Sequence, residues 1–369
     1  MPEFNPMDLS SATQFIEGAK TSTAAFVAPV AQGSVEPKLI SSWKEFTQVY
    51  GVGSDRGLAG VNLAEAVQGF FLNGGTRCYV AGTDGDGLAG YTAALAALEK
   101  VREVNIVVVP ELWQSETDAP GIAKAVAGHC VRAGNQVALL HTTQGASAED
   151  ARKTPGLFGL DETEAAFTSL YYPWIKVPGA DGTARVVPPA GHVAGVWART
   201  DAEKGVFKAP ANQNLRGADG LQTELSDDEN GQANEAGVNC LRTFPDRGVL
   251  VWGARTLSTD NDWRYLNVRR LANFLTDSIK TSTTWAAEEP NDQQLWSSLK
   301  ASVTSFLTDQ WRQGALLGRT PEEALYVTCD HTNNKPDTIQ AGQVVLDIGI
   351  AAVRPAEFIK IRIVLPAAA

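Results

Sequence analysis

Two apolar periodicities alternate along the first two thirds of the chain. Over 62–72 apolar side chains recur at helical spacing, whereas 104–109 and 137–141 are short and almost continuously apolar. Helical spacing predicts an amphipathic helix, and short apolar runs predict strands buried on both faces. The same patterns predict further helices over 91–102, 121–133 and 190–200, and further strands over 23–30, 77–81, 171–177 and 249–252. This alternation indicates a parallel or mixed sheet with helices on its faces.

Local signals refine these predictions at two places. Ser42 followed by Glu45 forms a capping box, which predicts a short helix that Ser42 caps and whose apolar face carries Phe46, Val49 and Tyr50. The stretch 208–239 is rich in Gly, Asn, Asp and Gln, so we predict a loop there with a short acidic helix near 226–234.

The last third of the chain combines two long helices with a strand-rich end. Apolar stripes predict helices over 262–280 and 291–313, the second about 30 Å long with an N-cap at Pro290-Asn291. Strands are predicted over 324–329, 344–353 and 358–365, and the last strand places four residues on one face: Ile359, Ile361, Ile363 and Leu365. Such a terminal strand can pair with another chain or close its own sheet, and the pattern leaves both open.

Composition and charge exclude several classes of protein. The chain has 369 residues and a net charge of −11, which argues against binding to a nucleic-acid backbone. No run approaches the ~20 apolar residues that span a bilayer, and the start lacks the features of a secretory signal. The four cysteines are widely scattered, which favours buried thiols in a reducing cytoplasm.

No constellation of residues predicts catalysis, a cofactor or a metal ion. The glycines of 51–57 lack the Lys-Ser/Thr of a phosphate loop, and the four histidines lack metal-ligand spacing. Cys329-Asp330-His331 is the one cluster of potential ligands, but neighbouring strand residues point to opposite faces. We therefore expect a buried Cys, a turn Asp and an exposed His, and we assign no catalytic, cofactor-binding or metal-binding residue.

Three arginines on one predicted helix admit two interpretations. Arg264, Arg269 and Arg270 either are surface charges paired with nearby aspartates, or form a basic face that docks an acidic partner protein. The aspartates within reach along the sequence are Asp260, Asp262 and Asp277.

Several ordered motifs carry a resemblance to a known family. The early ones are Thr23–Val30 and Asn73-Gly74-Gly75-Thr76-Arg77. The later ones are Trp252-Gly253-Ala254-Arg255-Thr256-Leu257, Trp263-Arg264-Tyr265-Leu266-Asn267-Val268-Arg269-Arg270, Glu289-Pro290-Asn291-Asp292, Gly314-Ala315-Leu316, Cys329-Asp330, and Ile348-Gly349 through Arg354-Pro355-Ala356-Glu357-Phe358-Ile359. In this order they resemble the tail sheath family of contractile phages, R-type bacteriocins and extracellular contractile injection systems.

The resemblance implies an α/β (α+β mixed) fold with an outer α/β sheet domain and an inner sheath domain. The inner domain would contain two long helices and a strand-exchanged sheet. The implied division is an N-terminal extended arm (1–22), a part that packs with the inner domain (23–84), the outer domain with a loop-rich end (85–249), the inner domain (250–349) and a C-terminal strand arm (350–369).

The resemblance also implies a structural subunit rather than an enzyme. Such subunits polymerise as stacked hexameric rings around an inner tube and contract to drive the tube through a target membrane. Expected partners are neighbouring sheath subunits, the inner tube protein, and baseplate and tail-terminator or cap proteins, with no cofactor, no nucleic acid and no direct membrane insertion. The particle would be assembled in the cytoplasm of the producing bacterium, either as a phage tail-like particle that can be released or as a virion.

Particular residues receive roles through this resemblance. The tube-facing candidates are Arg264, Arg269 and Arg270. The candidates for inter-subunit strand arms are Phe358, Ile359, Ile361, Ile363, Leu365, Phe26 and Val27.

Two other classes of function remain compatible with the patterns. An enzyme on a doubly wound α/β fold would suit the middle of the chain, although no active site is identified. A non-contractile scaffold could use the same strand exchange. Turnover of a substrate would favour the first class, and tubes of one fixed diameter would favour the second.

Overall fold

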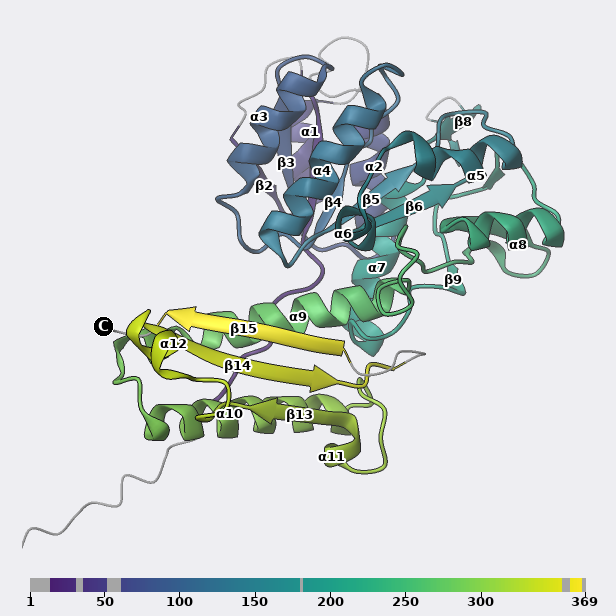
Figure 1. Ribbon diagram of the computed structural model, residues 1–369. Helices are drawn as coiled ribbons and strands as arrows, with labels where there is room; N and C mark the ends of the chain where they lie inside the picture. Colours follow the sequence, from purple (N-terminus) through teal and green to yellow (C-terminus); the bar gives the residue numbers. More distant parts are fainter. Residues whose placement is uncertain (1–13, 31–35, 52–60, 180–181, 354–358, 367–369) are drawn as a thin grey trace, which may run out of the picture. The chain divides into compact units, whose positions relative to one another are not determined.

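The computed structural model describes residues 14–30, 36–51, 61–179, 182–353 and 359–366 (Figure 1). The chain divides into two compact units. The large unit is Lys20–Asn273, and the small unit combines Met1–Ala19 with Phe274–Ala369. The chain therefore passes from one unit to the other twice.

The large unit contains a nine-stranded mixed sheet in the order β2-β3-β1-β4-β5-β6-β11-β12-β9. The six strands from β3 to β11 in this order are parallel to one another. The other three pairs are antiparallel: β2 with β3, β12 with β11, and β9 with β12. Their bounds are β1 Ala24–Pro29, β2 Lys38–Ile40, β3 Cys78–Thr83, β4 Ile106–Val108, β5 Val137–His141, β6 Thr168–Tyr172, β9 Gln213–Asn214, β11 Val238–Phe244 and β12 Gly248–Val251. The mixed sheet predicted from the apolar pattern is confirmed.

Helices cover both faces of this sheet. In β1, Ala24 and Phe26 contribute to one hydrophobic core and Ala25 and Val27 to the other, as expected for a strand with alternating side chains. The first core is completed by α1 (Trp43–Tyr50), α2 (Val61–Leu72) and α7 (Ala190–Lys204), and the second by α3 (Leu88–Leu98), α4 (Ala119–Ala133), α5 (Ala148–Leu157), α6 (Glu162–Ala166) and α8 (Asp227–Glu235). Helix α2 packs closely on α7. Gly191 permits this approach, since a Cβ at that position would overlap the backbone of Ala66.

A small three-stranded antiparallel sheet lies after β6 in the large unit. Its order is β10-β7-β8, with bounds β7 Ile175–Pro178, β8 Ala184–Val187 and β10 Gly220–Leu221. The single strand predicted over 171–177 is therefore divided between β6 and β7. Between them lies Pro173, which has no N–H to donate to a sheet.

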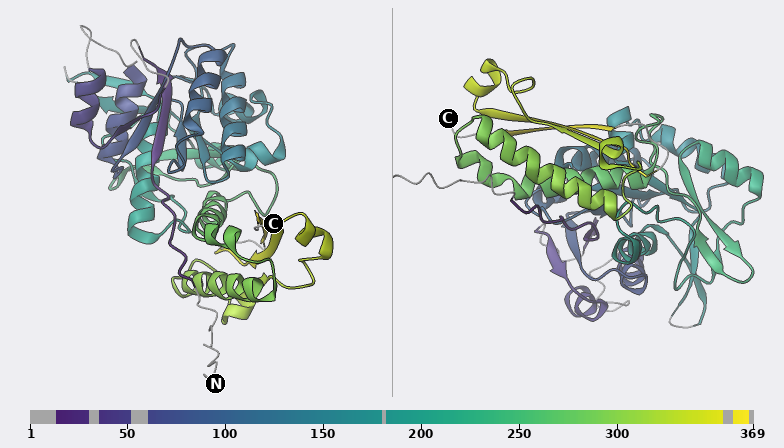
Figure 2. Two further views of the ribbon diagram at one scale, coloured as in Figure 1. Left: turned by 90° about the vertical axis from the view of Figure 1, so that its left-hand side faces the viewer. Right: turned by 90° about the horizontal axis from the view of Figure 1, so that it is seen from below.

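The small unit packs two long helices against an antiparallel sheet (Figure 2). Its elements are the end of α9 (Leu266–Ser282), a 3-10 turn (Thr284–Glu288), α10 (Gln293–Arg312), α11 (Pro321–Ala324), β13 (Leu325–Thr328), α12 (Pro336–Gln340), β14 (Gln343–Ile350) and β15 (Ile359–Pro366). The strand order is β13-β14-β15. Helix α10 begins later than predicted, because the side chain of Asp292, not Asn291, accepts from the N–H groups of Gln294 and Leu295.

The boundary between the two compact units differs from the predicted boundary between the outer and inner domains. The boundary lies inside α9, between Asn273 and Phe274, rather than at 249–250. The segment 23–84 contributes β1, β2 and β3 to the sheet of the large unit, where β1 pairs with β3 on one side and β4 on the other. This pairing places the N-terminal strands at the centre of the α/β sheet.

Candidate functional site: the anchors of the crossing segments

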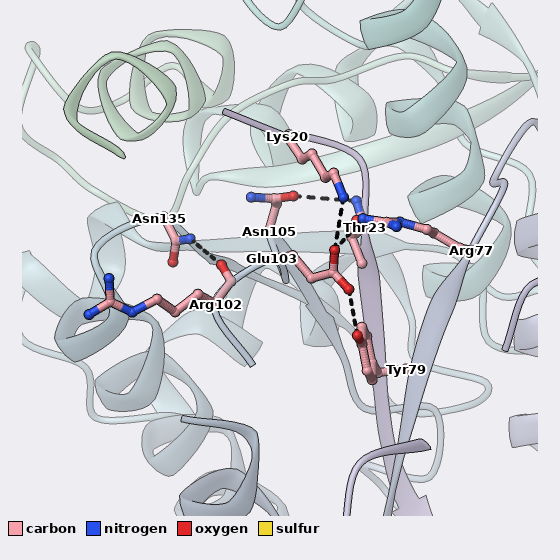
Figure 3. Close-up of polar contacts among 8 residues, drawn as sticks. All are labelled: Lys20, Thr23, Arg77, Tyr79, Arg102, Glu103, Asn105 and Asn135. Carbon is pink, nitrogen blue, oxygen red and sulfur yellow. Dashed lines mark hydrogen bonds and ion pairs between the residues drawn. The ribbon is translucent and has the colours of Figure 1, made fainter. Parts of the chain in front are cut away.

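A polar cluster in the large unit anchors the first crossing of the chain. The carboxylate of Glu103 accepts hydrogen bonds from the ammonium group of Lys20 at 3.0 Å, from the Tyr79 hydroxyl and from the Arg77 guanidinium (Figure 3). The hydrogen bond from Tyr79, followed by the hydrogen bond from Lys20 and the positive charges of Arg77 and Lys20, lowers the pKa of Glu103. Because all these side chains are partly exposed, solvent screens the ion pairs and their net stabilisation is modest.

Backbone hydrogen bonds extend this anchor to the start of β1. The N–H of Asn105 donates to the carbonyl of Thr23 at 2.9 Å, and the side-chain oxygen of Asn105 accepts from the N–H of Thr23 at 3.3 Å (Figure 3). The loop before β4 is held in turn by Asn135, whose amide donates to the carbonyl of Arg102 at 2.8 Å. The chain therefore enters the sheet at a fixed register immediately after the first crossing.

A buried ion pair anchors the second crossing in the same unit. Arg270 on α9 donates to both carboxylate oxygens of Asp201, at 2.9 and 2.6 Å, and to the carbonyl of Thr21 at 2.9 Å. Its guanidinium also lies 4.9 Å from the ring centroid of Trp197. Burial raises the pKa of Asp201, and the charge of Arg270 offsets part of that rise. One ion pair thus fixes the chain just after the first crossing and just before the second.

The structure buries two of the three arginines predicted to face a tube. Arg269 lies between Trp263 and Phe167, with its guanidinium 3.4 and 4.4 Å from the two ring centroids, and burial lowers its pKa to about 9. Arg270 is occupied by Asp201, which is not one of the aspartates expected from the sequence. Neither side chain forms part of an exposed basic face, because aromatic and ionic contacts inside the large unit enclose both. Arg264 is partly exposed and donates to the carbonyl of Thr259 at 3.2 Å.

Serine hydroxyls in the small unit hold the described end of the N-terminal arm. Three backbone N–H groups of the arm donate to serine Oγ atoms at 2.9–3.0 Å: Gln14 to Ser302, Glu17 to Ser282, and Ala19 to Ser278. These serines lie on α9 and α10. Ile16 is buried between the bonds, so 14–19 is a docked segment without regular secondary structure. Residues 1–13 of the predicted arm lie outside the described residues.

The terminal strand closes the sheet of its own chain in this structure. β15 pairs antiparallel with β14, from Gln343 opposite Pro366 to Ile350 opposite Ile359. This is one of the two arrangements that the apolar pattern left open. The register places the arm candidates Ile359, Ile361, Ile363 and Leu365 along this ladder, and Phe358 lies outside the described residues.

Phe26 and Val27 are not part of an arm. Both are fully buried in β1, and β1 has a hydrogen-bonded neighbour on each side from its own chain. A strand in that position has no free edge to offer a neighbouring subunit. The assignment of these two residues to an inter-subunit strand is therefore corrected.

The cluster Cys329-Asp330-His331 has the predicted arrangement. Cys329 is buried, and burial raises the pKa of its thiol to about 12. The Asp330 carboxylate accepts from the N–H and hydroxyl of Thr332 in a turn, and His331 is exposed. Among the described residues no group of three His, Cys, Asp or Glu side chains could hold a metal ion, and no described helix is long and apolar enough to cross a membrane.

Models of known protein families match the chain over two adjoining regions. A model of the phage tail sheath protein central domain matches residues 85–257, and a model of the phage tail sheath C-terminal domain matches residues 258–365. The chain belongs to the phage tail sheath family. This is a family of structural proteins, not of enzymes.

Solved sheath structures resemble the chain over nearly its whole length. The helical sheath of the anti-feeding prophage in its contracted state is 29% identical, with a TM-score of 0.80 and 97% coverage of both chains. The contracted PVC sheath of an extracellular contractile injection system is 28% identical, with a TM-score of 0.80 and coverage of 97% of this chain and 96% of that one.

Sequence relatives in this family are longer proteins. A prophage major tail sheath protein of Pseudomonas aeruginosa is 29% identical over 182 residues, which is 48% of this chain and 46% of the relative. The tail sheath protein of Burkholderia phage BcepMu is 33% identical over 174 residues, which is 42% of this chain and 36% of the relative. The matched region therefore spans less than half the length of either relative.

Proposed function

We propose that this chain is the sheath subunit of a contractile injection system or of a phage-like tail. The observation that carries the proposal is the similarity, over 97% of both chains, to a sheath captured in its contracted state. In this proposal the subunits polymerise as stacked hexameric rings around an inner tube. Contraction then drives the tube through a target membrane, and its energy is the difference in free energy between two packings of the same subunits.

The partners in this proposal are neighbouring sheath subunits, an inner tube protein, and baseplate and tail-terminator or cap proteins. The anti-feeding prophage relative, whose baseplate has also been solved, supports a baseplate contact. Assembly takes place in the cytoplasm of the producing bacterium, and the particle can be released from it. Arg264 remains our candidate for contact with the tube, because it is the one tube-facing candidate that is partly exposed.

The two units have separate roles in this proposal. The small unit, which carries most of the match to the sheath C-terminal domain, forms the inner layer, and the large unit forms the outer layer. Rigid-body reorientation requires connections that survive the movement. The Arg270–Asp201 pair and the Glu103 cluster support this role, since they fix both crossings within the large unit.

Strand exchange through β15 links neighbouring subunits in this proposal. If β15 of one subunit pairs with β14 of the next, the same register and the same backbone bonds form as within one chain. Each bond contributes only about 1 kcal/mol net, so cohesion comes from their repetition along the sheath.

The test is negative-stain electron microscopy of the purified protein, with two truncations. The full chain and a chain without Ala367–Ala369, which leaves β15 intact, should form long hollow cylinders. A chain without Phe358–Ala369 should keep its circular dichroism spectrum but stay unpolymerised. If this last truncation forms cylinders, the strand-exchange proposal is refuted, but the sheath proposal is not. If the full chain forms no cylinders even when co-expressed with its tube protein, the sheath proposal itself fails.

A further inference from the structure

A polar cavity opens at the carboxyl ends of three parallel strands in the large unit. Its volume is about 600 Å³. The described lining residues come from four places in the fold. Those after β4 are Pro110, Glu111, Trp113, Gln114 and Glu116, and those at or after the end of β5 are His141, Thr143 and Gln144. Trp174 follows β6, and Asn62 lies at the start of α2. In open α/β sheets, ligands bind outside the carboxyl ends of the strands. The position of the cavity therefore matches a general ligand-binding position.

Two tryptophans of the cavity wall are held in fixed orientations. The indole N–H of Trp113 donates to the carbonyl of His141 at 2.7 Å, and that of Trp174 donates to the carbonyl of Thr142 at 2.7 Å. His141 is the last residue of β5, and Thr142 follows it. Because hydrogen bonds to backbone carbonyls hold both rings, their orientation is set before any ligand arrives.

His141 contributes unused hydrogen-bonding groups to the same wall. Its side chain is 0% exposed, and neither ring nitrogen has a hydrogen-bond partner. Its ring meets Trp174 edge to face, with centroids 5.6 Å apart. Burial lowers the pKa of His141 to about 3, so at neutral pH the imidazole has one donor and one acceptor nitrogen. Buried polar groups are normally paired, so these nitrogens favour a ligand with hydrogen-bonding groups.

The charged side chains among the described lining residues are all acidic. The lining includes Glu111 and Glu116 and, among the described residues, no lysine or arginine. One oxygen of Glu111 accepts from the Asn62 amide at 2.8 Å, and the other accepts from the N–H of Leu63 at 3.2 Å. A carboxylate has about four acceptor positions, so Glu111 keeps acceptor capacity after capping the start of α2.

We propose that this cavity binds an organic cation that bears a primary ammonium or guanidinium group. Glu111 accepts an N–H of the cation, an aromatic face of Trp113 or Trp174 attracts its charge, and the acceptor nitrogen of His141 takes a further N–H. The cation is either a free small amine or a basic side chain of a protein. Every described lining residue belongs to the large unit.

The direct test is ¹⁹F NMR of the full chain labelled with 5-fluorotryptophan and titrated with n-butylammonium chloride. The chain has nine tryptophans, seven of which lie outside the cavity lining and act as internal references. Saturable shifts should be confined to the signals of Trp113 and Trp174, the former assigned with Trp113→Phe. The neutral isostere 1-butanol should cause no such shifts. Equal responses to both compounds, shifts at all nine signals, or no response would overturn the proposal.

Variants test the assigned contacts. Glu111→Gln should weaken binding of n-butylammonium at least about tenfold, because a charge-assisted hydrogen bond is lost. Trp113→Leu should weaken it several-fold, whereas Trp252→Leu, a partly exposed tryptophan outside the cavity, should leave it unchanged. If Glu111→Gln disturbs the capped helix, as circular dichroism would show, Trp113→Leu carries the test. Unchanged affinity in Trp113→Leu would overturn the proposal.

A second titration distinguishes the two sources of the cation. The tripeptide acetyl-Ala-Lys-Ala-amide is compared with its norleucine analogue. Binding of the lysine peptide with an affinity like that of n-butylammonium assigns the cavity to a basic side chain of a protein. Binding of the free amine alone assigns it to a small amine, and equal binding of the two peptides would contradict a cation site.

Discussion

Replacing Arg270 with methionine is expected to destabilise the large unit by about 3–5 kcal/mol. The side chains of Arg270 and Asp201 are 3% and 4% exposed, and the guanidinium donates to both carboxylate oxygens and to the carbonyl of Thr21. Methionine preserves an unbranched side chain but removes the charge and the donors. Asp201 is then left as a buried carboxylate without its ionic partner, which accounts for the size of the expected effect.

The loss of stability should depend on pH in a defined direction. Burial already raises the pKa of Asp201, and Arg270 opposes that rise. Without Arg270 the pKa rises further, so the native variant binds a proton at pH values where the unfolded chain is ionised. A native state that binds more protons than the unfolded state gains stability as the pH falls. The difference in free energy of unfolding between the wild type and Arg270→Met should therefore become smaller as the pH falls from 7 toward about 3.9, the pKa of Asp in the unfolded chain.

Urea unfolding followed by tryptophan fluorescence measures this effect, because Trp197 lies 4.9 Å from the guanidinium. The matched control is Arg312→Met, which breaks the exposed pair with Asp309, whose side chains are 66% and 52% exposed. That control should cost less than about 1 kcal/mol. The double variant with Asp201→Leu should recover much of the loss. The reasoning is refuted if Arg270→Met costs no more than the control, or if its deficit widens as the pH falls.

Three further substitutions test other parts of the structure. Gly349→Ala should destabilise the small unit by about 1–3 kcal/mol in thermal unfolding, since its Cβ would overlap the Tyr326 ring; no change would contradict that packing. Ser278→Ala should cost about 1 kcal/mol and speed hydrogen exchange at Ala19, whose N–H loses its acceptor; unchanged exchange would reject this anchor. Cys329→Ala should cost about 1 kcal/mol without altering metal content by mass spectrometry; loss of a bound metal would revive a ligand site there.

The positions of helices and strands could be predicted because their signals are local. The predicted strand 137–141 has the same first and last residues as β5, and the predicted helix 62–72 begins one residue later than α2. The predicted cap at Ser42 is confirmed, since its side chain accepts from the N–H of Glu45. The sequence-based prediction was wrong where a strand has few apolar residues, because such a segment was predicted to be a loop. The whole of β9 and β10 and the start of β11 lie within the predicted loop 208–239.

The anchors of the crossing segments could not be found from spacing. Glu103 lies 83 positions from Lys20, and Asp201 lies 69 positions from Arg270. No periodicity relates residues so far apart, so the sequence suggested only nearby aspartates as partners for the arginines. The sheet brings Glu103 close to Lys20, since β1 lies beside β4 although β2 and β3 separate them along the chain.

The sequence by itself determined which segments are helical or extended, which faces are apolar, and which family the motifs resemble. These properties follow from side-chain periodicity and order, which are written along the chain. The tertiary structure decided which strand neighbours which, that Phe26 and Val27 lie in a central strand, and that Arg269 and Arg270 are buried. Such outcomes depend on the partner that each face or charge meets, and folding selects that partner from distant parts of the sequence.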